Sequence, residues 1–186
     1  MTATLPATNR RWLLAARPRG AVRESDFRLV EAPLAPLQPG QFRIRTLYLG
    51  VAAVMRGYML NTEKFERPLE LGDVMHGRGV GRIIESRHPG FEVGEIVHGK
   101  LGWQDYAIAD GSPYYLMYKV HQRVAPVSTA LGVLGLTGFT AYLGLVDVGA
   151  VRPGDTVLVS GAAGGVGSSV GQVARNLGAT AVGIAG

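Results

Sequence analysis

The strongest constraint on the fold is the order of segments between residues 156 and 186. The β-branched apolar run TVLVSG is typical of a strand buried on both faces. AAGGVGSSVGQVARNLGA then has the pattern of a glycine loop leading into a helix over about residues 166–177, with Gly178 as its stop. TAVGIAG is typical of a second buried strand. Strand, glycine loop, helix and strand in this order predict a βαβ unit.

The glycine loop matches the pattern G-x-G-x-x-G at Ala162, Gly164 and Gly167, with alanine in place of the first glycine. Gly164 would let backbone N–H groups approach a pyrophosphate, and Gly167 would let the helix pack closely against the strand. The positive end of the helix would then point at that anion. The loop therefore predicts a dinucleotide site, and the open alternative is a glycine-rich helix–sheet contact without a ligand. A P-loop is excluded because no Gly-Lys-Ser/Thr follows.

The choice of dinucleotide depends on the end of the second strand. A site for NAD places Asp or Glu about 20 residues beyond the glycines, where it bonds the ribose 2′-hydroxyl. After Asp155 the chain holds neither residue type, and the strand ends as Ile184-Ala185-Gly186. Without that carboxylate a 2′-phosphate meets no repulsion, so the sequence favours NADP over NAD.

The first two-thirds of the chain is predicted to be β-structure. Short alternating runs such as DFRLVEAP, QFRIRTLYLGV and GRGVGRIIES are separated by Gly, Pro or charge, which is typical of a small sandwich or a partly open barrel. In QFRIRTLYLGV we expect Phe42, Ile44 and Thr46 on one face and Arg43 and Arg45 on the other. A short helical turn is expected in AAVMRGYML.

The short runs predicted as strands give way to a longer apolar run after Pro126, so we expect one domain over residues 1–126 and another over 127–186. The second domain would open with a helix within STALGVLGLTGFTAYLGLVDVG. Ser128 or Thr129 is its expected N-cap, Gly149 its expected end, and Gly138 the point where it would break.

Composition excludes several kinds of protein. With no cysteine among 186 residues, a disulfide scaffold and every cysteine-ligated metal site are ruled out. The four histidines, at 76, 88, 98 and 121, have no metal-ligand spacing, so no metal is expected. The net charge of +5 comes mostly from arginines, and no run of five or more basic residues occurs, which favours a solvated surface over nucleic-acid binding. The uncharged stretches carry turn signals, so no membrane span is expected, and without a signal peptide we expect a cytoplasmic protein.

The chain resembles the zinc-independent branch of the medium-chain dehydrogenase/reductases that includes prostaglandin/leukotriene reductases, plant double-bond reductases and bacterial curcumin reductase. The matching segments are Asn9–Trp12, Leu47–Leu49, Met55–Gly57, Glu85–Ser86, Gly102–Tyr106, Leu131–Gly135, Gly138–Tyr142 and the glycine loop. The resemblance implies a barrel like that of the GroES co-chaperonin, followed by the first βαβ unit of a Rossmann fold.

The resemblance also implies an activity, namely NADPH-dependent reduction of the double bond of α,β-unsaturated ketones and aldehydes by hydride transfer to the β-carbon. Gly164, Gly165, Val166 and Gly167 would hold the pyrophosphate, and Thr140 would lie near the nicotinamide. Two alternatives stay open: a quinone reductase of the same fold, and a truncated, non-catalytic chain or binding module.

Two departures from the family pattern affect the substrate site. The family often has Asp-Pro-Tyr-Met-Arg where this chain has AAVMR, so Val54 replaces a substrate-facing tyrosine. Tyr58 is the nearest phenol and a candidate catalytic group, although it can equally serve packing. Family chains are almost twice as long, so the proton donor and the 2′-phosphate ligand are expected beyond Gly186. A homodimer is expected from the resemblance alone, and the substrate, an enone or a quinone, stays open.

Overall fold

The structure is a computed structural model that describes residues 8–62, 66–121, 123 and 125–186. The chain divides into two compact units, residues 1–124 and 125–186, and each is described by itself. This division falls two residues before the domain boundary predicted from the sequence, which lies between residues 126 and 127.

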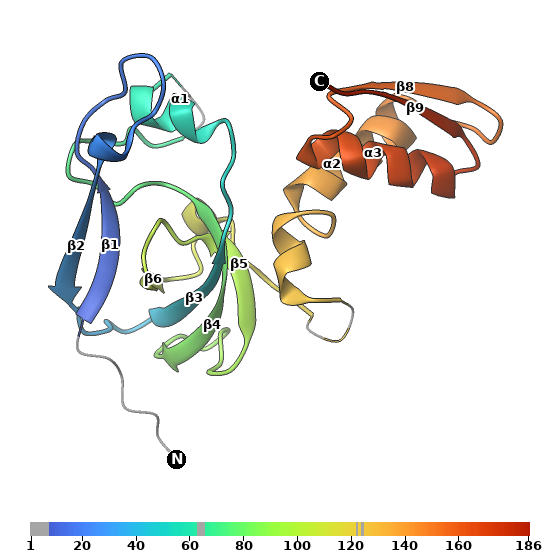
Figure 1. Ribbon diagram of the computed structural model, residues 1–186. Helices are drawn as coiled ribbons and strands as arrows, with labels where there is room; N and C mark the ends of the chain where they lie inside the picture. The colour runs from blue at the N-terminus through green and yellow to red at the C-terminus, as the bar shows by residue number, and fades with distance from the viewer. Residues whose placement is uncertain (1–7, 63–65, 122, 124) are drawn as a thin grey trace. The chain divides into compact units, whose positions relative to one another are not determined.

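The first unit consists mainly of antiparallel strands (Figure 1). Strands β1 (Thr8–Leu14) and β2 (Phe27–Pro33) pair with each other. A second, five-stranded sheet has the order β6-β3-β4-β5-β7. Its strands are β3 (Phe42–Leu49), β4 (Arg78–Ser86), β5 (Ile96–Lys100), β6 (Tyr106–Ala109) and β7 (Tyr118–Lys119). The short helices are η1 (Glu24–Asp26), α1 (Met55–Leu60) and η2 (Pro113–Tyr115).

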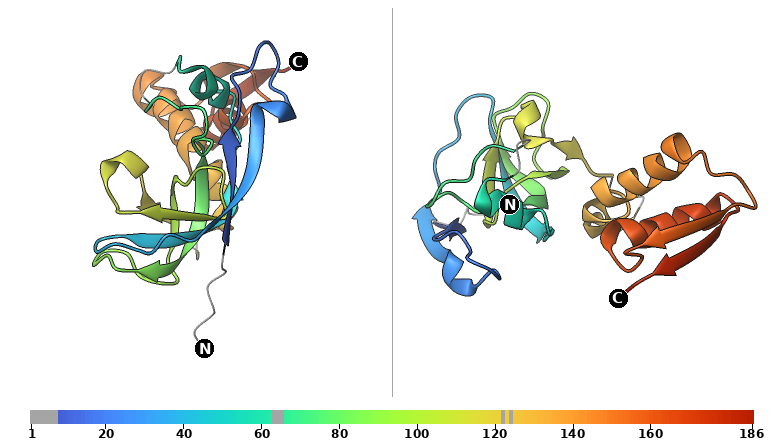
Figure 2. Two further views of the ribbon diagram at one scale, coloured as in Figure 1. Left: turned by 90° about the vertical axis from the view of Figure 1, so that its left-hand side faces the viewer. Right: turned by 90° about the horizontal axis from the view of Figure 1, so that it is seen from above.

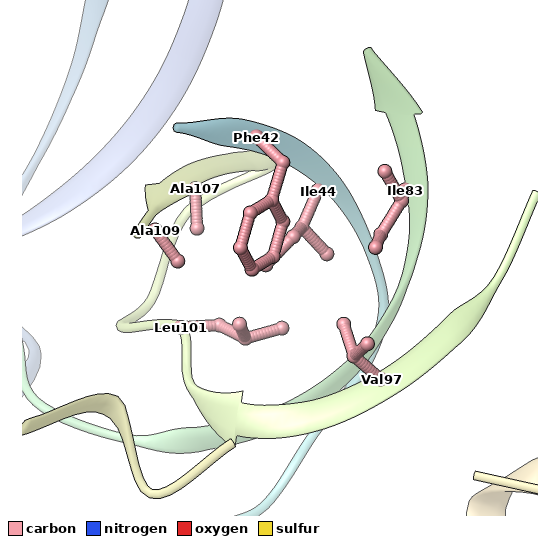
Figure 3. Packing of buried hydrophobic residues seen from close by; sticks show 7 residues of the cluster. All are labelled: Phe42, Ile44, Ile83, Val97, Leu101, Ala107 and Ala109. Atoms are coloured by element: carbon pink, nitrogen blue, oxygen red, sulfur yellow. The ribbon is translucent and has the colours of Figure 1, made fainter. Parts of the chain in front are cut away.

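The core of this unit forms where the five-stranded sheet curls around apolar side chains. Figure 3 shows the Phe42 ring among Ile44, Ile83 and Val97, with Leu101 below it. All five side chains are buried, and the ring of Phe91 stacks on Phe42 with 4.3 Å between centroids. The alternation expected along QFRIRTLYLGV is therefore correct for Phe42 and Ile44. A second cluster lies under α1 and contains Leu14, Met55, Met59, Leu69 and Met75.

Arg43, expected on the other face of the strand, is also buried, and its residue is only 3% exposed. Its guanidinium donates to the Glu85 carboxylate at 3.0 Å and to the Ala35 carbonyl at 2.7 Å. A buried cation is tolerated when its charge is paired and its N–H groups are hydrogen-bonded. Glu85 is opposite Arg43 in the β3–β4 register, so the pairing of the strands supplies the partner.

The second unit contains the predicted βαβ unit. Strands β8 (Thr156–Ser160) and β9 (Thr180–Ile184) pair in parallel, and α3 (Gly165–Asn176) connects them. The right-hand view of Figure 2 shows α3 along one face of this pair. Ala174 of α3 and Leu145 are buried there, with Val157 and Ala181 of the strands packed against them. The preceding segments are η3 (Val127–Leu131), α2 (Leu136–Leu143) and the π-helical turn η4 (Gly144–Val148).

The structure corrects three details of this unit. The helix expected from Ser128 to Gly149 breaks at residues 132–135, ahead of the predicted Gly138. Neither Ser128 nor Thr129 is its N-cap, because Pro126 holds that position for η3 and the Thr129 hydroxyl donates back to the Pro126 carbonyl. The strands are covered on one face only in the described chain, and Leu158 is 66% exposed. The apolar run alone indicates burial without saying which residues supply the cover.

Candidate functional site

The loop between β8 and α3 makes a tight turn that is closed by its own backbone. Gly161 has φ +62°, a left-handed conformation that glycine adopts without strain. Its carbonyl accepts the N–H of Gly164 at 2.9 Å. The N–H of Ala162 donates to the Ile184 carbonyl at 3.0 Å, which ties the loop to the end of β9.

The first turn of α3 packs directly on this loop through Gly167. A Cβ at position 167 would lie 2.3 Å from the Gly161 carbonyl oxygen and 2.8 Å from the Ala162 Cα. Both neighbours are backbone atoms, so they cannot swing aside as the end of a flexible side chain would. Position 167 therefore admits only glycine without a shift of the backbone. This is the close approach predicted for the third glycine of the motif.

The start of α3 presents unsatisfied backbone donors. The first N–H groups of a helix have no partner within the helix, and no acceptor in the described ranges meets those of Gly165, Val166 and Gly167. Gly164, Gly165 and Val166 are exposed, and the first turn carries no acidic side chain. A helix start with open N–H groups and a positive dipole end binds phosphate. The geometry of the loop therefore fits the diphosphate of a dinucleotide.

Thr140 lies on α2, the helix that packs beside α3. One turn earlier on α2, the methyl group of Thr137 comes within 3.3 Å of the Cβ position of Gly165, so α2 borders the glycine loop. The Thr140 hydroxyl donates to the Leu136 carbonyl at 2.7 Å, and its residue is exposed. The proton of this hydroxyl is therefore committed to the helix, while its oxygen can still accept a hydrogen bond.

Tyr58 lies in the other unit, on α1, where it packs against the cluster of Met55 and Met59. The edge of its ring meets His76, with 6.0 Å between the ring centroids. The structure thus brings the predicted loop residues together with the helix that carries Thr140, and it places Tyr58 in a separate unit. Tyr58 nevertheless lines a cavity, which sequence reasoning did not anticipate.

This cavity has a volume of about 520 Å³ and lies beside β4 and β5 in the first unit. Much of its wall is apolar, with Val74, Leu101, Ala107, Ile108 and Tyr115 among the lining residues. Its wall also carries an ion pair between the Lys100 ammonium and the Glu66 carboxylate, with 2.7 Å between Nζ and Oε1. The two side chains are 18% and 8% exposed. The Lys100 Nζ also lies 4.8 Å from the centre of the Tyr114 ring.

Charge and burial act in opposite directions on the titrating groups of this cavity. Burial raises the pKa of Glu66, but the hydrogen bond and charge of Lys100 outweigh it and hold that pKa below its usual value. Burial lowers the pKa of His76, which favours the neutral form of its imidazole. Both ring nitrogens of His76 are enclosed, and neither has a partner in the described part of the chain.

No single sequence motif predicts this cavity. Its polar residues lie far apart in the sequence, with 48 positions between Glu66 and Tyr114, and the fold of the chain brings them together. Trp103 and Tyr106, which flank the cavity-lining Gln104 in the sequence, make contacts of their own. Trp103 stacks on Phe27 with 5.3 Å between centroids, and the Tyr106 backbone N–H donates to Asn9.

Metal and membrane features are absent from the described residues. Over 8–62, 66–121, 123 and 125–186, no group of three His, Asp or Glu side chains could hold a metal ion. Within the same ranges, no helix combines the length and the apolar character needed to cross a bilayer.

Comparison with known proteins identifies the family. A family model described as the N-terminal domain of oxidoreductase matches residues 10–116. The NADPH-dependent curcumin reductase of Escherichia coli (strain K12) is 43% identical over 178 residues, which are 96% of this chain and 51% of that protein. Prostaglandin reductase 1 of Oryctolagus cuniculus is 38% identical over 175 residues, which are 94% of this chain and 48% of that protein.

A solved structure has the same fold. CurA from Vibrio vulnificus, crystallised in complex with NADPH, superposes with a TM-score of 0.84 at 40% identity, covering 95% of this chain and 52% of that one. The chain belongs to this oxidoreductase family, the medium-chain dehydrogenase/reductases. The predicted fold class, a GroES-like barrel followed by the first βαβ unit of a Rossmann fold, is confirmed. The chain spans about half the length of the curated relatives that it matches.

Proposed function

We propose that the protein is an NADPH-dependent reductase of the carbon–carbon double bond of α,β-unsaturated ketones and aldehydes. The observation that carries this proposal is the start of α3, where the N–H groups of Gly165, Val166 and Gly167 are open on a loop that leaves no room for a Cβ at position 167. Relatives whose names specify NADPH, curcumin reductase and the CurA complex, support the choice of coenzyme.

In this proposal the two units have separate tasks. Residues 127–186 begin the NADP-binding domain, in which Gly164, Gly165, Val166 and Gly167 hold the diphosphate and Thr140 borders the nicotinamide. Residues 1–126 form the substrate domain, whose cavity beside β4 and β5 holds the substrate. Zinc takes no part, the protein is cytoplasmic, and a homodimer is the expected assembly.

Bound NADPH supplies the hydride that the β-carbon of the substrate accepts. The residues of this chain bind and orient the reactants. The open N–H groups at the start of α3 neutralise diphosphate charge and fix the coenzyme. The apolar side chains of the cavity wall around Leu101 and Ile108 would displace water from the part of the substrate that they contact.

The test measures coenzyme consumption by the natural polypeptide that contains these residues. We expect oxidation of NADPH in the presence of simple alkenones and alkenals, at rates above those with quinones matched in size. Faster turnover of quinones would replace the proposal by quinone reduction. Binding of NADPH without turnover of either class would leave a non-catalytic binding module. Dialysis against a metal chelator should leave the rate unchanged.

The coenzyme preference is tested separately by fluorescence titration. Because no carboxylate follows β9 at residues 185 and 186, we expect tighter binding of NADPH than of NADH. Equal or tighter binding of NADH would contradict this part of the proposal.

A further inference from the structure

The reduction of an enone moves negative charge onto the carbonyl oxygen of the substrate. When a hydride forms the new C–H bond at the β-carbon, the electron pair of the double bond shifts toward that oxygen, and a proton from solvent then completes the C–H bond at the α-carbon. A donor that is already in place near the oxygen lowers the barrier to this step. We propose that Lys100 is this donor and that Glu66 positions it; the inference rests on the proposed function.

The first argument is the way in which the Lys100 ammonium is held. One of its three N–H groups donates to Glu66 Oε1 at 2.7 Å, and the face of the Tyr114 ring lies 4.8 Å from Nζ. No second oxygen acceptor for Nζ is present among residues 8–62, 66–121, 123 and 125–186. Lys100 lines the cavity, so its remaining N–H groups are available to a substrate oxygen there.

The second argument is the free energy that it costs to bury the Lys100–Glu66 ion pair. Lys100 and Glu66 are 18% and 8% exposed, and removing two charges from water is not recovered by their mutual attraction alone. Apolar residues of similar volume would serve packing at least as well. A buried ion pair on the wall of a cavity that also has apolar side chains therefore points to a polar ligand group that this pair is there to meet.

Three other polar groups of the cavity, His76, Arg67 and Arg78, are less suitable donors. The ring nitrogens of His76 are enclosed. Arg67 is 58% exposed on its side chain and lies 3.5 Å from Asp73. Arg78 is opposite Lys100 in the β4–β5 register and also lines the cavity. Its guanidinium has no ion pair within the described part of the chain to hold it in place, as Glu66 holds Lys100.

Activity measurements test the role of the charge. Lys100→Met keeps the length of the side chain and removes the ammonium, whereas Lys100→Arg keeps a charged donor. We expect kcat/KM for enones to fall about 100-fold in the Met variant, as for loss of one preorganised donor, with less than a 10-fold fall in the Arg variant. The Kd for NADPH should stay the same in both. Lys119→Met, at an ion pair with Glu95 outside the cavity, is the matched control and should leave all constants unchanged.

Lys100→Met leaves Glu66 buried without its partner, which threatens folding. The double variant Glu66→Gln/Lys100→Met removes both charges together and should fold, with the same loss of kcat/KM. Glu66→Gln alone keeps the Lys100 ammonium but loosens its position, so we expect kcat to fall. Lys100→Arg keeps both charges of the pair, so we expect it to stay active. Unchanged kcat/KM in the folded double variant would overturn the assignment of Lys100.

A binding measurement separates this inference from the proposed function. Titration with a saturated ketone, which accepts a hydrogen bond and cannot be reduced at a double bond, is followed by calorimetry. We expect the Kd to rise about 10-fold from wild type to the double variant. If wild type fails to reduce enones yet shows this rise, the proposed activity fails and the Lys100 site stands. If the Kd is the same in both, or wild type binds no ketone, the Lys100 site is overturned.

Discussion

Gly167 and the carbonyl of Gly161 are in such close contact that a Cβ at position 167 would lie 2.3 Å from the carbonyl oxygen. This contact sets the start of α3 against the loop after β8, and it is what aims the N–H groups of Gly165 and Val166 outward. The close approach thus links the stability of the second unit to the binding site that we propose for the coenzyme.

Gly167→Ala should weaken both stability and coenzyme binding. Because the added methyl group meets backbone atoms, we expect a loss of about 1–3 kcal/mol in the free energy of unfolding, as for other overpacked sites. The Kd for NADPH should rise at least about 10-fold, since a shift of the first helical turn misdirects charged hydrogen bonds. Thermal melting and fluorescence titration measure the two effects.

The matched control lies on the same helix. A Cβ at Gly171 would have no atom within 4 Å, so Gly171→Ala meets no obstacle. It should raise stability by roughly 0.5–1 kcal/mol through helix propensity and leave the Kd unchanged. Equal effects of the two substitutions would show that the close contact at Gly167 has no special role.

Residues 185 and 186, directly after β9, carry no carboxylate, so adding one there should change the coenzyme preference. In Ala185→Asp we expect the Kd for NADPH to rise at least about 10-fold relative to the Kd for NADH, because the new charge repels the 2′-phosphate and can bond a 2′-hydroxyl. Ala185→Asn has nearly the same shape without the charge and is the control. An equal shift in the Asn variant would mean that shape, not charge, decides the preference.

The buried Arg43 should make Glu85 important for folding. Glu85→Ala leaves the guanidinium with the Ala35 carbonyl and without a counter-charge. We expect a loss of about 2 kcal/mol, below the 3–5 kcal/mol of a fully buried pair because the Glu85 side chain is 34% exposed. Glu95→Ala breaks the more exposed pair with Lys119 and should cost less than about 1 kcal/mol. Denaturant unfolding compares the two, and similar losses would contradict the account of Arg43.

His98 should make stability depend on pH in the mildly acidic range. Burial, and then the charge of Arg78, lower its pKa from 6.5 to about 4. Between these values the unfolded chain binds a proton that the folded chain does not, so stability falls as pH drops from about 6.5 to 4. The shift corresponds to roughly 3 kcal/mol.

A variant isolates this effect from other titrating groups. His98 stacks on Tyr118 with 4.5 Å between centroids, so His98→Phe keeps a ring in the same place. The unfolding free energies of wild type and variant are compared from pH 7 to pH 4. As the pH falls, wild type should lose up to roughly 3 kcal/mol more stability than the variant. A difference that does not vary with pH would contradict the shifted pKa.

The glycine loop was predictable from sequence because the residues that form its turn and the first turn of α3 lie in one local segment. Strand, turn and helix follow directly from the pattern around Gly161 and Gly167. The barrel strands were predictable for the same reason, as at Phe42 and Ile44, where side chains alternate.

What sequence reasoning missed depends on contacts between distant segments. The sequence around Arg43 does not indicate that Glu85 will pair with its guanidinium. The sequence around Lys100 likewise does not indicate that Glu66 and Tyr114 will contact its ammonium. The one-sided burial of β8 likewise depends on which residues cover the sheet, which a single apolar run such as TVLVSG does not specify.

The most direct test of the central claim follows backbone amides during titration with NADPH. In ¹⁵N-labelled natural polypeptide, we predict saturable shifts of the Gly165, Val166 and Gly167 N–H resonances, with the same Kd as the fluorescence change of the coenzyme. If NADPH binds while these three resonances stay in place, the start of α3 does not hold the diphosphate and the account is wrong.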